Sequence, residues 1–495
     1  MKKVAFAALC AAFGILHTLL FYKQQWGINL LLFETPLFLL LYAYNKPLFS
    51  NRTPLLLLAG CFLSMLAVLV THSSLSCFVH TLFFVLLSGA TLQPISNPAA
   101  YFVSALEKIP EILLLPFSKQ KTTTVADKSY RTTFVLRATI VPLLIIVVFV
   151  YFYSLAVPRF DRLLGDFFQL FPQLNFTTVW LFISGTVLTV FVLRVSKSNT
   201  VSNFDAVQPD TLQRTKGFNK FRTLTLGLKK EHLSMLILLV GLNLLIAIIN
   251  GLDIASYWFS YSPVSYEDMK ILVHEGTYLL IFCIMLSVGV VLYAFRKNLN
   301  FYPNNKTIRY LGIAWMVQNG IMVLSVAWRN YWYIQSYNLA YKRIAVLVFL
   351  AATLFGIATV IFKIQQRKTG YHLLKLNSFF VLVLLAALAF VNWDLLITRY
   401  NLTHKDTAYI HKNYLADMSN AALPVLLEYQ DVFDSPIEKQ MSYNHLYRQY
   451  GDSGTYKRII DAKAQKFMEQ YENRHWLSYN ISDARTAEYL KQQGY

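Results

Sequence analysis

Long apolar stretches alternate with short polar stretches along most of this chain. Eleven of the apolar stretches carry few charges and are each roughly twenty residues long, the length of an α-helix that crosses a bilayer. Lipid offers no partner for free backbone N–H and C=O groups, so each stretch is predicted to be helical. The predicted spans are 4–22, 28–45, 54–70, 75–93, 133–157, 176–195, 233–259, 273–295, 308–328, 343–363 and 375–397. The pattern therefore predicts an all-α fold, a polytopic transmembrane helix bundle.

The polar connections add three details to this picture. The third and fourth spans are separated only by THSS, which predicts a tight helical hairpin. The first span leaves into FYKQQWG without a small-residue cleavage pattern, so it is predicted to be retained rather than removed as a signal peptide. Residues 97–120 are apolar along part of their length and predict an interfacial helix, whereas residues 196–230 form a polar, basic loop.

The distribution of Lys and Arg predicts how the chain is threaded through the membrane. With the N-terminus in the cytoplasm, the connections on the cytoplasmic side hold 25 of these residues, and those on the outer side before the tail hold 7. Cytoplasmic connections are usually the basic ones. Eleven spans then place the C-terminal tail, 401–495, on the periplasmic or extracellular face of a bacterial inner membrane.

Two domains are predicted from this threading, a transmembrane domain over 1–400 and a helical extramembrane domain over 401–495. The tail holds 11 basic and 12 acidic residues and is therefore almost neutral. Its pattern predicts helices over 406–429, 435–451, 454–474 and 482–494, with Asp406 and Ser435 as N-caps and Pro424 as a break. Such paired helices are more typical of a small scaffolding bundle than of a catalytic domain.

Composition narrows the classes of partner. The chain is 56% hydrophobic and only 14% charged, which fits a protein whose main partner is the lipid bilayer. Its net charge is +19, but the excess lies in short connections, so anionic lipid head groups are expected at the basic loops and nucleic acid is not. The four cysteines all lie in apolar runs and show no metal-ligand spacing, so neither a metal nor a cofactor is predicted.

Two stretches resemble a family of bacterial multi-pass membrane proteins known only as domains of unknown function, the four-one-five-three and four-one-seven-three groups. In NWDLLITRYNL and YLADMSNAALPVL, the matching residues are Asn392, Asp394, Arg399, Tyr400, Asn401, Tyr414, Leu415, Ser419 and Pro424. In WRNYWYIQSYNLAYKRI they are Arg329, Tyr337, Leu339 and Arg343, with Asn338 where the family has Gly and Ala340 where it has Thr. The resemblance covers roughly 230–426 and implies a polytopic inner-membrane protein. It implies no activity.

The sequence contains no phosphate loop, nucleotide fingerprint, zinc spacing or nucleophile motif. Candidate chemistry is therefore limited to polar residues in or beside the spans, which are costly in hydrocarbon. One group is predicted at the outer face, at similar depth: Asp253, His274, Glu275, Arg329, Asn330 and Asp394. They are candidates for binding a head group or an ion, and the alternative is that Asp253 or Asp394 pairs with Arg329 to fasten helices.

A second group is predicted within the spans. Glu34 and Arg137 are candidates for a buried pair or a proton-linked site, and Arg137 lies close enough to the inner end to snorkel. Asn243 and Asn250 are seven residues apart on one helical face, which predicts hydrogen bonds between helices.

Three classes of function remain open. A sensory or scaffolding protein, with a possible protein partner for 401–495, is favoured because the tail is helical in pattern and no catalytic motif is found. The alternatives are a transporter of a small solute and an envelope enzyme acting on a lipid-linked substrate at the outer face. Whether the chain is an enzyme stays open.

Overall fold

The computed structural model describes residues 3–90, 95–113, 175–195, 200–214, 228–258, 277–295, 297–437 and 454–495, with the single positions 150 and 159. These residues fall into two compact units. Unit 1 contains Met1–Ala206 and Asn473–Ala484, and unit 2 contains Val207–Glu472 and Arg485–Tyr495. The regular structure of the described ranges is helical, without a β-strand, which confirms the predicted all-α fold.

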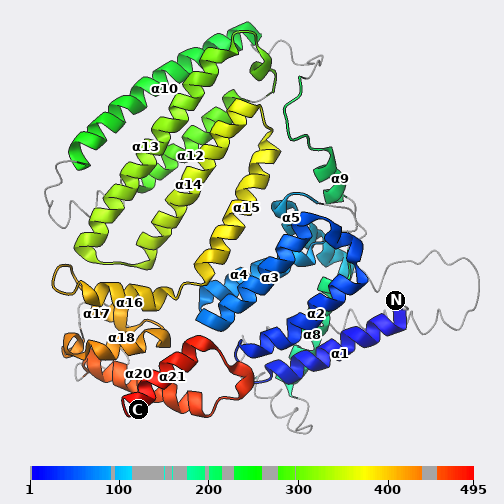
Figure 1. Cartoon of the computed structure of the whole chain (residues 1–495), viewed down its shortest axis with the longest axis vertical. Coiled ribbons are helices and arrows are strands. Elements are labelled where there is room, and N and C mark those ends of the chain that lie inside the picture. Colours follow the sequence, from blue (N-terminus) through cyan, green and yellow to red (C-terminus); the bar gives the residue numbers. More distant parts are fainter. Residues whose placement is uncertain are drawn as a thin grey trace, which may run out of the picture. The chain divides into compact units, whose positions relative to one another are not determined.

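Unit 1 is a set of apolar helices that pack in pairs (Figure 1). Helix α1 packs against α8, and α3 packs against α4, while α2 contacts α1, α3 and α8. Helix α5 crosses the end of α4 and also contacts α8. The elements are α1 (Lys3–Phe21), α2 (Ile28–Tyr44), η1 (Lys46–Ser50), α3 (Arg52–Thr71), α4 (Ser74–Ser88), α5 (Pro98–Leu113), α8 (Phe176–Leu193), α9 (Thr200–Val207) and η7 (Trp476–Ser478).

The predicted hairpin between the third and fourth spans is confirmed. Helix α3 ends at His72, which adopts the left-handed conformation with φ of 45° that commonly stops a helix. Helix α4 begins immediately with a capping box, in which the Ser73 hydroxyl accepts from the Ser76 N–H and the Ser76 hydroxyl accepts from the Ser73 N–H. These two local devices explain how so short a connection reverses the chain.

Small residues allow α1 and α8 to approach closely. A Cβ atom added to Gly14 would lie 2.2 Å from the Thr186 hydroxyl, and one added to Gly185 would lie 2.4 Å from the His17 Cβ atom. Close packing through small residues is a usual means of joining helices in a membrane, where lipid removes the hydrophobic force between them. This close contact joins α1, the first span of unit 1, to α8, the last span of that unit.

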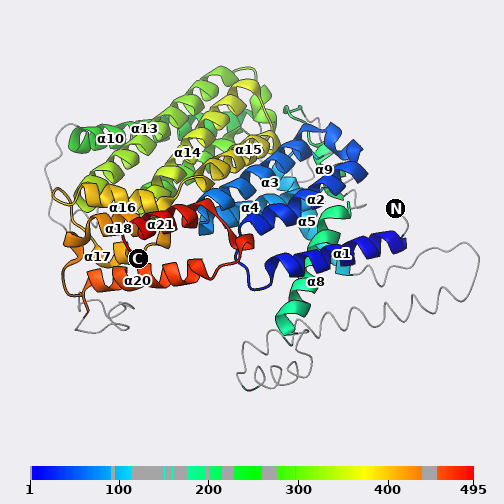
Figure 2. The same ribbon diagram turned by 60° about the horizontal axis from the view of Figure 1, so that its bottom comes forward.

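Unit 2 is a bundle whose long helices run side by side, as both views show (Figures 1 and 2). Helix α13 contacts α10, α12 and α14, and α14 contacts α15. The elements of this bundle are α10 (Leu228–Tyr257), α12 (Thr277–Ala294), η4 (Lys297–Phe301), α13 (Asn305–Tyr337), α14 (Tyr341–Gln366) and α15 (Gly370–Ala389).

The described helices have the surface of a multi-pass membrane protein. Among the described residues, seven helices are long and apolar enough to cross a bilayer, and α2, α4 and the Leu279–Ala294 part of α12 are shorter apolar helices. Large apolar side chains such as Ile237, Leu244 and Ile248 are exposed, whereas Ser64 and Asn319 are buried. Apolar outside and polar inside is the pattern expected in lipid.

The predicted spans match these helices, with clear differences at two boundaries. The span predicted over 308–328 continues in α13 to Tyr337. The last span was predicted to reach residue 397, but α15 ends at Ala389. A new helix, α16 (Trp393–Thr403), then begins at Asn392, whose side chain accepts the Leu395 N–H. The hydrophobic pattern did not predict this break, because apolar residues lie on both sides of Asn392. The predicted span 133–157, apart from position 150, and residues 273–276 of the span 273–295 lie outside the described residues.

Contacts between helix ends sort the connections of unit 1 into two sets. Thr53 at the start of α3 donates to the carbonyl of Ser96, and the Ser96 N–H donates to Asp205 of the basic loop. At the other end, Tyr22 after α1 bonds Asn175 before α8. We call these the basic-loop end and the tail end, because tail residues 474–483 lie at the second.

Unit 2 shows the same alternation. At its basic-loop end, His232 bonds the carbonyl of Asn304, and Thr369 bonds Pro209 and Asp210. At its tail end, the Trp258 indole donates to Ser325. Successive described helices therefore run in alternate directions, as a multi-pass chain requires.

Buried lysines cap helices at the basic-loop end of both units. The Lys108 ammonium donates to the carbonyls of Ser88 and Phe191, in the last turns of α4 and α8. The Lys363 ammonium donates to the carbonyl of Phe295, immediately after α12. The last carbonyls of a helix lack intrahelical partners and carry the negative end of its dipole, so a cation there satisfies both requirements.

The tail folds into short helices around its own apolar core within unit 2. Leu402, Leu426, Phe433, Ile460 and Phe467 are among the buried residues of this core. The predicted helix over 406–429 is broken into shorter pieces, and Asp406 lies in a turn rather than at an N-cap. Of the predicted helix 435–451, residues 435–437 are not helical and 438–451 lie outside the described residues. The last two predicted helices are confirmed. The elements are α16, α17 (Lys412–Ala416), η5 (Asn420–Ala422), α18 (Leu423–Glu428), η6 (Gln430–Phe433), α20 (Tyr456–Glu472) and α21 (Ile481–Gln492).

The two stretches that carry the family resemblance meet where the tail packs on the bundle. Asn401 of α16 exchanges two hydrogen bonds with the backbone of Leu339, between α13 and α14. The Arg343 guanidinium donates to the carbonyls of Tyr337 and Asn338. Asn338 stands where the family has Gly, and its φ of 65° with ψ of −175° lies in a region that suits Gly almost alone.

We predict that Asn338→Gly is more stable than Asn338→Ala. Both variants lose the hydrogen bond from the Asn338 amide to the Tyr409 carbonyl, but only Gly removes the backbone strain, worth roughly 1–3 kcal/mol. The measurement is the thermal unfolding midpoint of each purified variant in detergent. Equal midpoints would contradict the strained conformation.

Candidate functional site

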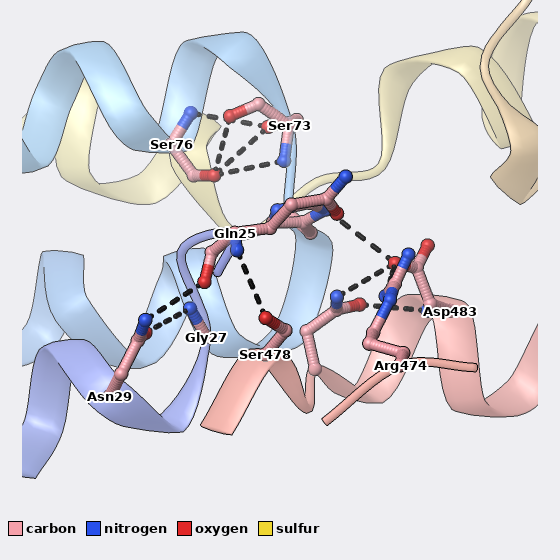
Figure 3. Close-up of polar contacts among 10 residues, drawn as sticks. Gln25, Gly27, Asn29, Ser73, Ser76, Arg474, Ser478 and Asp483 are labelled. Atoms are coloured by element: carbon pink, nitrogen blue, oxygen red, sulfur yellow. Dashed lines mark hydrogen bonds and ion pairs between the residues drawn. The ribbon is translucent and has the colours of Figure 1, made fainter. Parts of the chain in front are cut away.

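A segment of the tail is bound at the tail end of unit 1, where it contacts the connection between α1 and α2 (Figure 3). The Gln25 N–H donates to the Ser478 hydroxyl over 2.9 Å, and that hydroxyl donates to the Gln24 amide oxygen over 2.7 Å. The Ile28 N–H donates to the Tyr479 carbonyl over 3.0 Å. More than 450 residues of sequence separate the two partners. The sequence pattern gave no sign of this contact.

The α1–α2 connection is shaped to receive the tail segment. The buried Asn29 side chain accepts the Gly27 N–H and donates to the carbonyls of Leu20 and Gln25, so one amide holds the whole turn. Gly27 then leaves room for the incoming backbone, because a Cβ atom there would lie 2.5 Å from the Tyr479 carbonyl oxygen. A single small residue therefore controls whether the segment fits.

Charged groups fix the other side of the same segment. Asp483 accepts from Arg474 over 2.5 Å and from Asn480 over 2.8 Å, and its carboxylate lies 3.7 Å from His72 between α3 and α4. Burial lowers the pKa of His72, while the Asp483 charge opposes this shift. His72 is therefore neutral at pH 7, and Arg474 is the cation that balances Asp483.

The predicted outer-face residues that the structure describes lie at the tail end of unit 2, where they take part in separate contacts. Arg329 of α13 forms an ion pair with Asp253 of α10, and both side chains are about one-tenth exposed. The pairing joins two long helices. It corresponds to the fastening role that the sequence left open as an alternative to ligand binding.

The other two described members of that group also join elements. Asn330 donates to the carbonyl of Arg343, which links α13 to α14. Asp394 accepts from the Tyr341 hydroxyl over 2.5 Å and from the Ser419 N–H over 3.1 Å, so it ties α14 to the tail. His274 and Glu275 lie outside the described residues.

Asn243 and Asn250 form the predicted hydrogen bonds between helices. Asn243 of α10 donates to the carbonyl of Leu311 and accepts from the Gln318 amide of α13. Asn250 donates to the carbonyl of Gln318 over 2.9 Å. The two amides, seven residues apart, therefore fasten α10 along α13. Gln318 completes this pattern, and the sequence analysis did not identify it.

Glu34 has a partner that the sequence did not predict. Its carboxylate lies 3.0 Å from the His80 imidazole of α4, and His80 is in turn 3.2 Å from the Ser64 hydroxyl of α3. Arg137, the predicted partner, lies outside the described residues. Helical periodicity places Glu34 and His80 in spans but does not show which spans touch, so their pairing required the structure.

The described residues contain no group of three or more His, Cys, Asp or Glu side chains that could hold a metal ion. Cys10, Cys61, Cys77 and Cys283 are all free thiols. The polar contacts of the described residues include a tail-binding site, contacts that fasten helices and the buried Glu34–His80 pair.

A model of the family described as Domain of unknown function (DUF4153) matches residues 4–429. The match covers more than half of the chain, so the chain belongs to this family. A search of the curated proteins and a search of the solved structures each found no match.

We predict that Gly27→Ala releases the tail segment from unit 1. The added methyl group cannot share space with the Tyr479 carbonyl, and losing hydrogen bonds of about 1 kcal/mol each raises the open population roughly tenfold or more. The measurement is the rate of trypsin cleavage after Arg474 in the folded protein. Gly251→Ala is the matched control, because no atom lies within 4 Å of its added Cβ. Equal cleavage rates in both variants would refute the role of Gly27.

Proposed function

We propose that this member of the DUF4153 family is an inner-membrane protein that acts as a sensor or scaffold, coupling its tail, 401–495, to its basic loop, 196–230. The observation that carries the proposal is that each of these extramembrane segments is anchored in both units. The boundaries between the units fall at residue 206 in the loop and at residues 472 and 484 in the tail. A change in either segment therefore reaches both sets of membrane helices.

The tail supplies one half of this argument. Its segment 474–483 is bound in unit 1 by Gln25 and Ile28, and its helices α16 to α20 pack in unit 2. Near that packing, Lys463 donates to the carbonyls of Ala416 and Met418, and burial lowers the pKa of this lysine. The tail is thus held by specific contacts at several points along its length, which suits a segment that transmits a change in position.

The basic loop supplies the other half. In unit 1, Asp205 of α9 accepts from the N–H and the hydroxyl of Ser96 over 2.7 Å and 3.2 Å. In unit 2, the Leu212 N–H donates to the carbonyl of Arg367, and Asp210 bonds His372, which lowers the pKa of Asp210. The loop is therefore anchored on both sides of residue 206.

The orientation belongs to the proposal as well: the N-terminus in the cytoplasm, the basic loop at the cytoplasmic face and the tail in the periplasm or outside the cell. The bias of Lys and Arg toward the basic-loop end supports this direction. Anionic head groups are the expected partner of the loop. Trp476 and Tyr479, which are 60% and 45% exposed, are the expected contact points of a protein partner on the tail.

The enzyme alternative requires His274, Glu275 and Arg329 to face one cavity. Arg329 is engaged with Asp253, and the other two lie outside the described residues. The transporter alternative requires titratable or polar groups deep within the spans, and only the Glu34–His80 pair supplies titratable groups that contact each other there in the described helices.

The orientation predicts the accessibility of two engineered thiols. In a chain whose four cysteines are replaced by alanine, Thr407→Cys in the tail is labelled by a membrane-impermeant maleimide on intact cells. Ser50→Cys, at the opposite end of the helices, is labelled only after lysis. Both positions are exposed. If only Ser50→Cys were labelled on intact cells, the orientation would be opposite to the proposed one. The tail could then not respond to signals outside the cell.

The coupling predicts that releasing the tail changes the basic loop. Gly27→Ala should raise amide hydrogen exchange in α9 and in residues 209–212 about tenfold, which corresponds to about 1.4 kcal/mol of local stability. The comparison is with the wild type and with Gly251→Ala, all measured in nanodiscs by mass spectrometry. Exchange confined to the tail in Gly27→Ala would show that the two segments are not coupled.

A further inference from the structure

Three helices of unit 1 bring polar side chains together at one depth. Glu34 is six residues after the start of α2, His80 is six residues after the start of α4, and Ser64 is seven residues before the end of α3. Each is therefore roughly 10 Å, or two helical turns, from the same end of the bundle. The exposed fractions are 4% for Glu34, 2% for His80 and zero for Ser64. Two titratable groups are thus enclosed within apolar helices.

The hydrogen bonds of this cluster have a defined direction. The Ser64 hydroxyl donates its single proton to the carbonyl of Cys61 over 3.0 Å. With that proton used, the hydroxyl oxygen can accept from His80 Nδ1, 3.2 Å away, in the tautomer that carries a proton on Nδ1. The other ring nitrogen, Nε2, faces the Glu34 Oε1 atom at 3.0 Å. One proton is then shared between Glu34 and His80, as O–H in the neutral pair or N–H in the ion pair.

The second oxygen of Glu34 shows that the pair is incompletely satisfied. Among the described residues, the buried Oε2 atom has no hydrogen-bond partner. An unmatched carboxylate oxygen in hydrocarbon costs free energy, and among the described residues the Oδ2 atom of Asp253 shares this feature. Unit 2 fastens α10 to α13 with the uncharged amides of Asn243 and Gln318 and with the Asp253–Arg329 ion pair, whose guanidinium stays protonated. The Glu34–His80 pair differs from both contacts, because each of its two members can exist with or without a proton.

We propose that Glu34 and His80 form a proton-binding site within the membrane-spanning part of unit 1. With the shared proton present, the pair has no net charge, which suits an apolar surrounding. When the proton leaves to water, the O–H or N–H bond breaks, the pair becomes an anion, and no electrons are transferred. In the tautomer with a proton on Nδ1, the Ser64 hydroxyl accepts from that nitrogen, and the exchanging proton lies between Nε2 and Oε1.

The described groups around this pair leave its charge uncompensated. The buried Cys61 thiol of α3 is near Glu34, and His17 of α1 is bonded to the carbonyl of Leu181. Helix α8 has no ionisable side chain, and neither has η7. Lys108 of α5 bonds carbonyls at the basic-loop end, while His72, Arg474 and Asp483 lie at the tail end. No cation in the described part of unit 1 touches Glu34 except His80.

Trp26 offers a direct signal for the protonation of His80. Its ring lies edge to face with the His80 imidazole, with the ring centroids 6.2 Å apart, and a protonated imidazole quenches indole fluorescence. Subtracting the titration of Trp26→Phe from that of the wild type isolates this one tryptophan among the eight in the chain. The titration is run on the full chain in nanodiscs between about pH 4 and pH 10, which brackets ordinary His and carboxyl titration.

We expect one step in the Trp26 signal of the wild type. Glu34→Gln should move its midpoint to lower pH by roughly one to three units, because the carboxylate that favours imidazolium is gone. His80→Gln should abolish the step. His17→Gln is the control and should leave the step unchanged, since His17 lies outside the hydrogen-bonded chain. No step in the wild type, or an unchanged midpoint in Glu34→Gln, would overturn the proposal.

A second measurement needs no variant and covers the case in which a substitution prevents folding. Infrared spectra of wild-type protein with 13C-labelled glutamate should show the carboxylic acid band of a buried glutamic acid, and its intensity should change with pH over the same range as the Trp26 signal. A band that does not follow the Trp26 step would also overturn the site.

Discussion

The cost of leaving polar groups without partners in hydrocarbon governs this structure from the ends of its helices to its interior. Helices satisfy their own backbone except at their first N–H groups and their last carbonyls, and in each unit the chain places a lysine at such carbonyls. Lys108 serves α4 and α8, and Lys363 serves the end of α12. A buried ammonium ion is itself costly, so it is stable only where several carbonyl dipoles meet it. These lysines therefore fix which helix ends lie together.

The same constraint separates two uses of polar side chains. In unit 2, amides and one ion pair join α10 to α13, and each member bonds the neighbouring helix directly. These contacts resist separation of the helices and have no need to change charge. In unit 1, a carboxylate of α2 and an imidazole of α4 form a buried contact between helices. The difference in chemistry, at similar burial, is what gives the Glu34–His80 pair a role beyond packing.

The sequence predicted the helices much better than it predicted their partners. Spans were found because roughly twenty apolar residues in a row admit few other structures, and the α3–α4 hairpin followed from its short connection. The end of α15 was missed because Leu395 and Leu396 continue the apolar run past the cap at Asn392. Glu34 and Asp253 were recognised as costly residues, but their partners His80 and Arg329 depend on which helices touch. Binding of 474–483 was invisible for the same reason.

One short connection joins the two features of unit 1 that have chemical interest. Trp26 lies against the His80 ring, and its neighbours Gln25 and Gly27 form the surface that receives Ser478 and Tyr479. If a proton enters the Glu34–His80 pair, the ring beside Trp26 changes its charge distribution while the next peptide groups hold the tail. Thermodynamic linkage then requires reciprocity: any effect of the proton on tail binding equals the effect of tail binding on proton affinity. The three consecutive residues 25–27 therefore contact both the His80 ring and the tail segment.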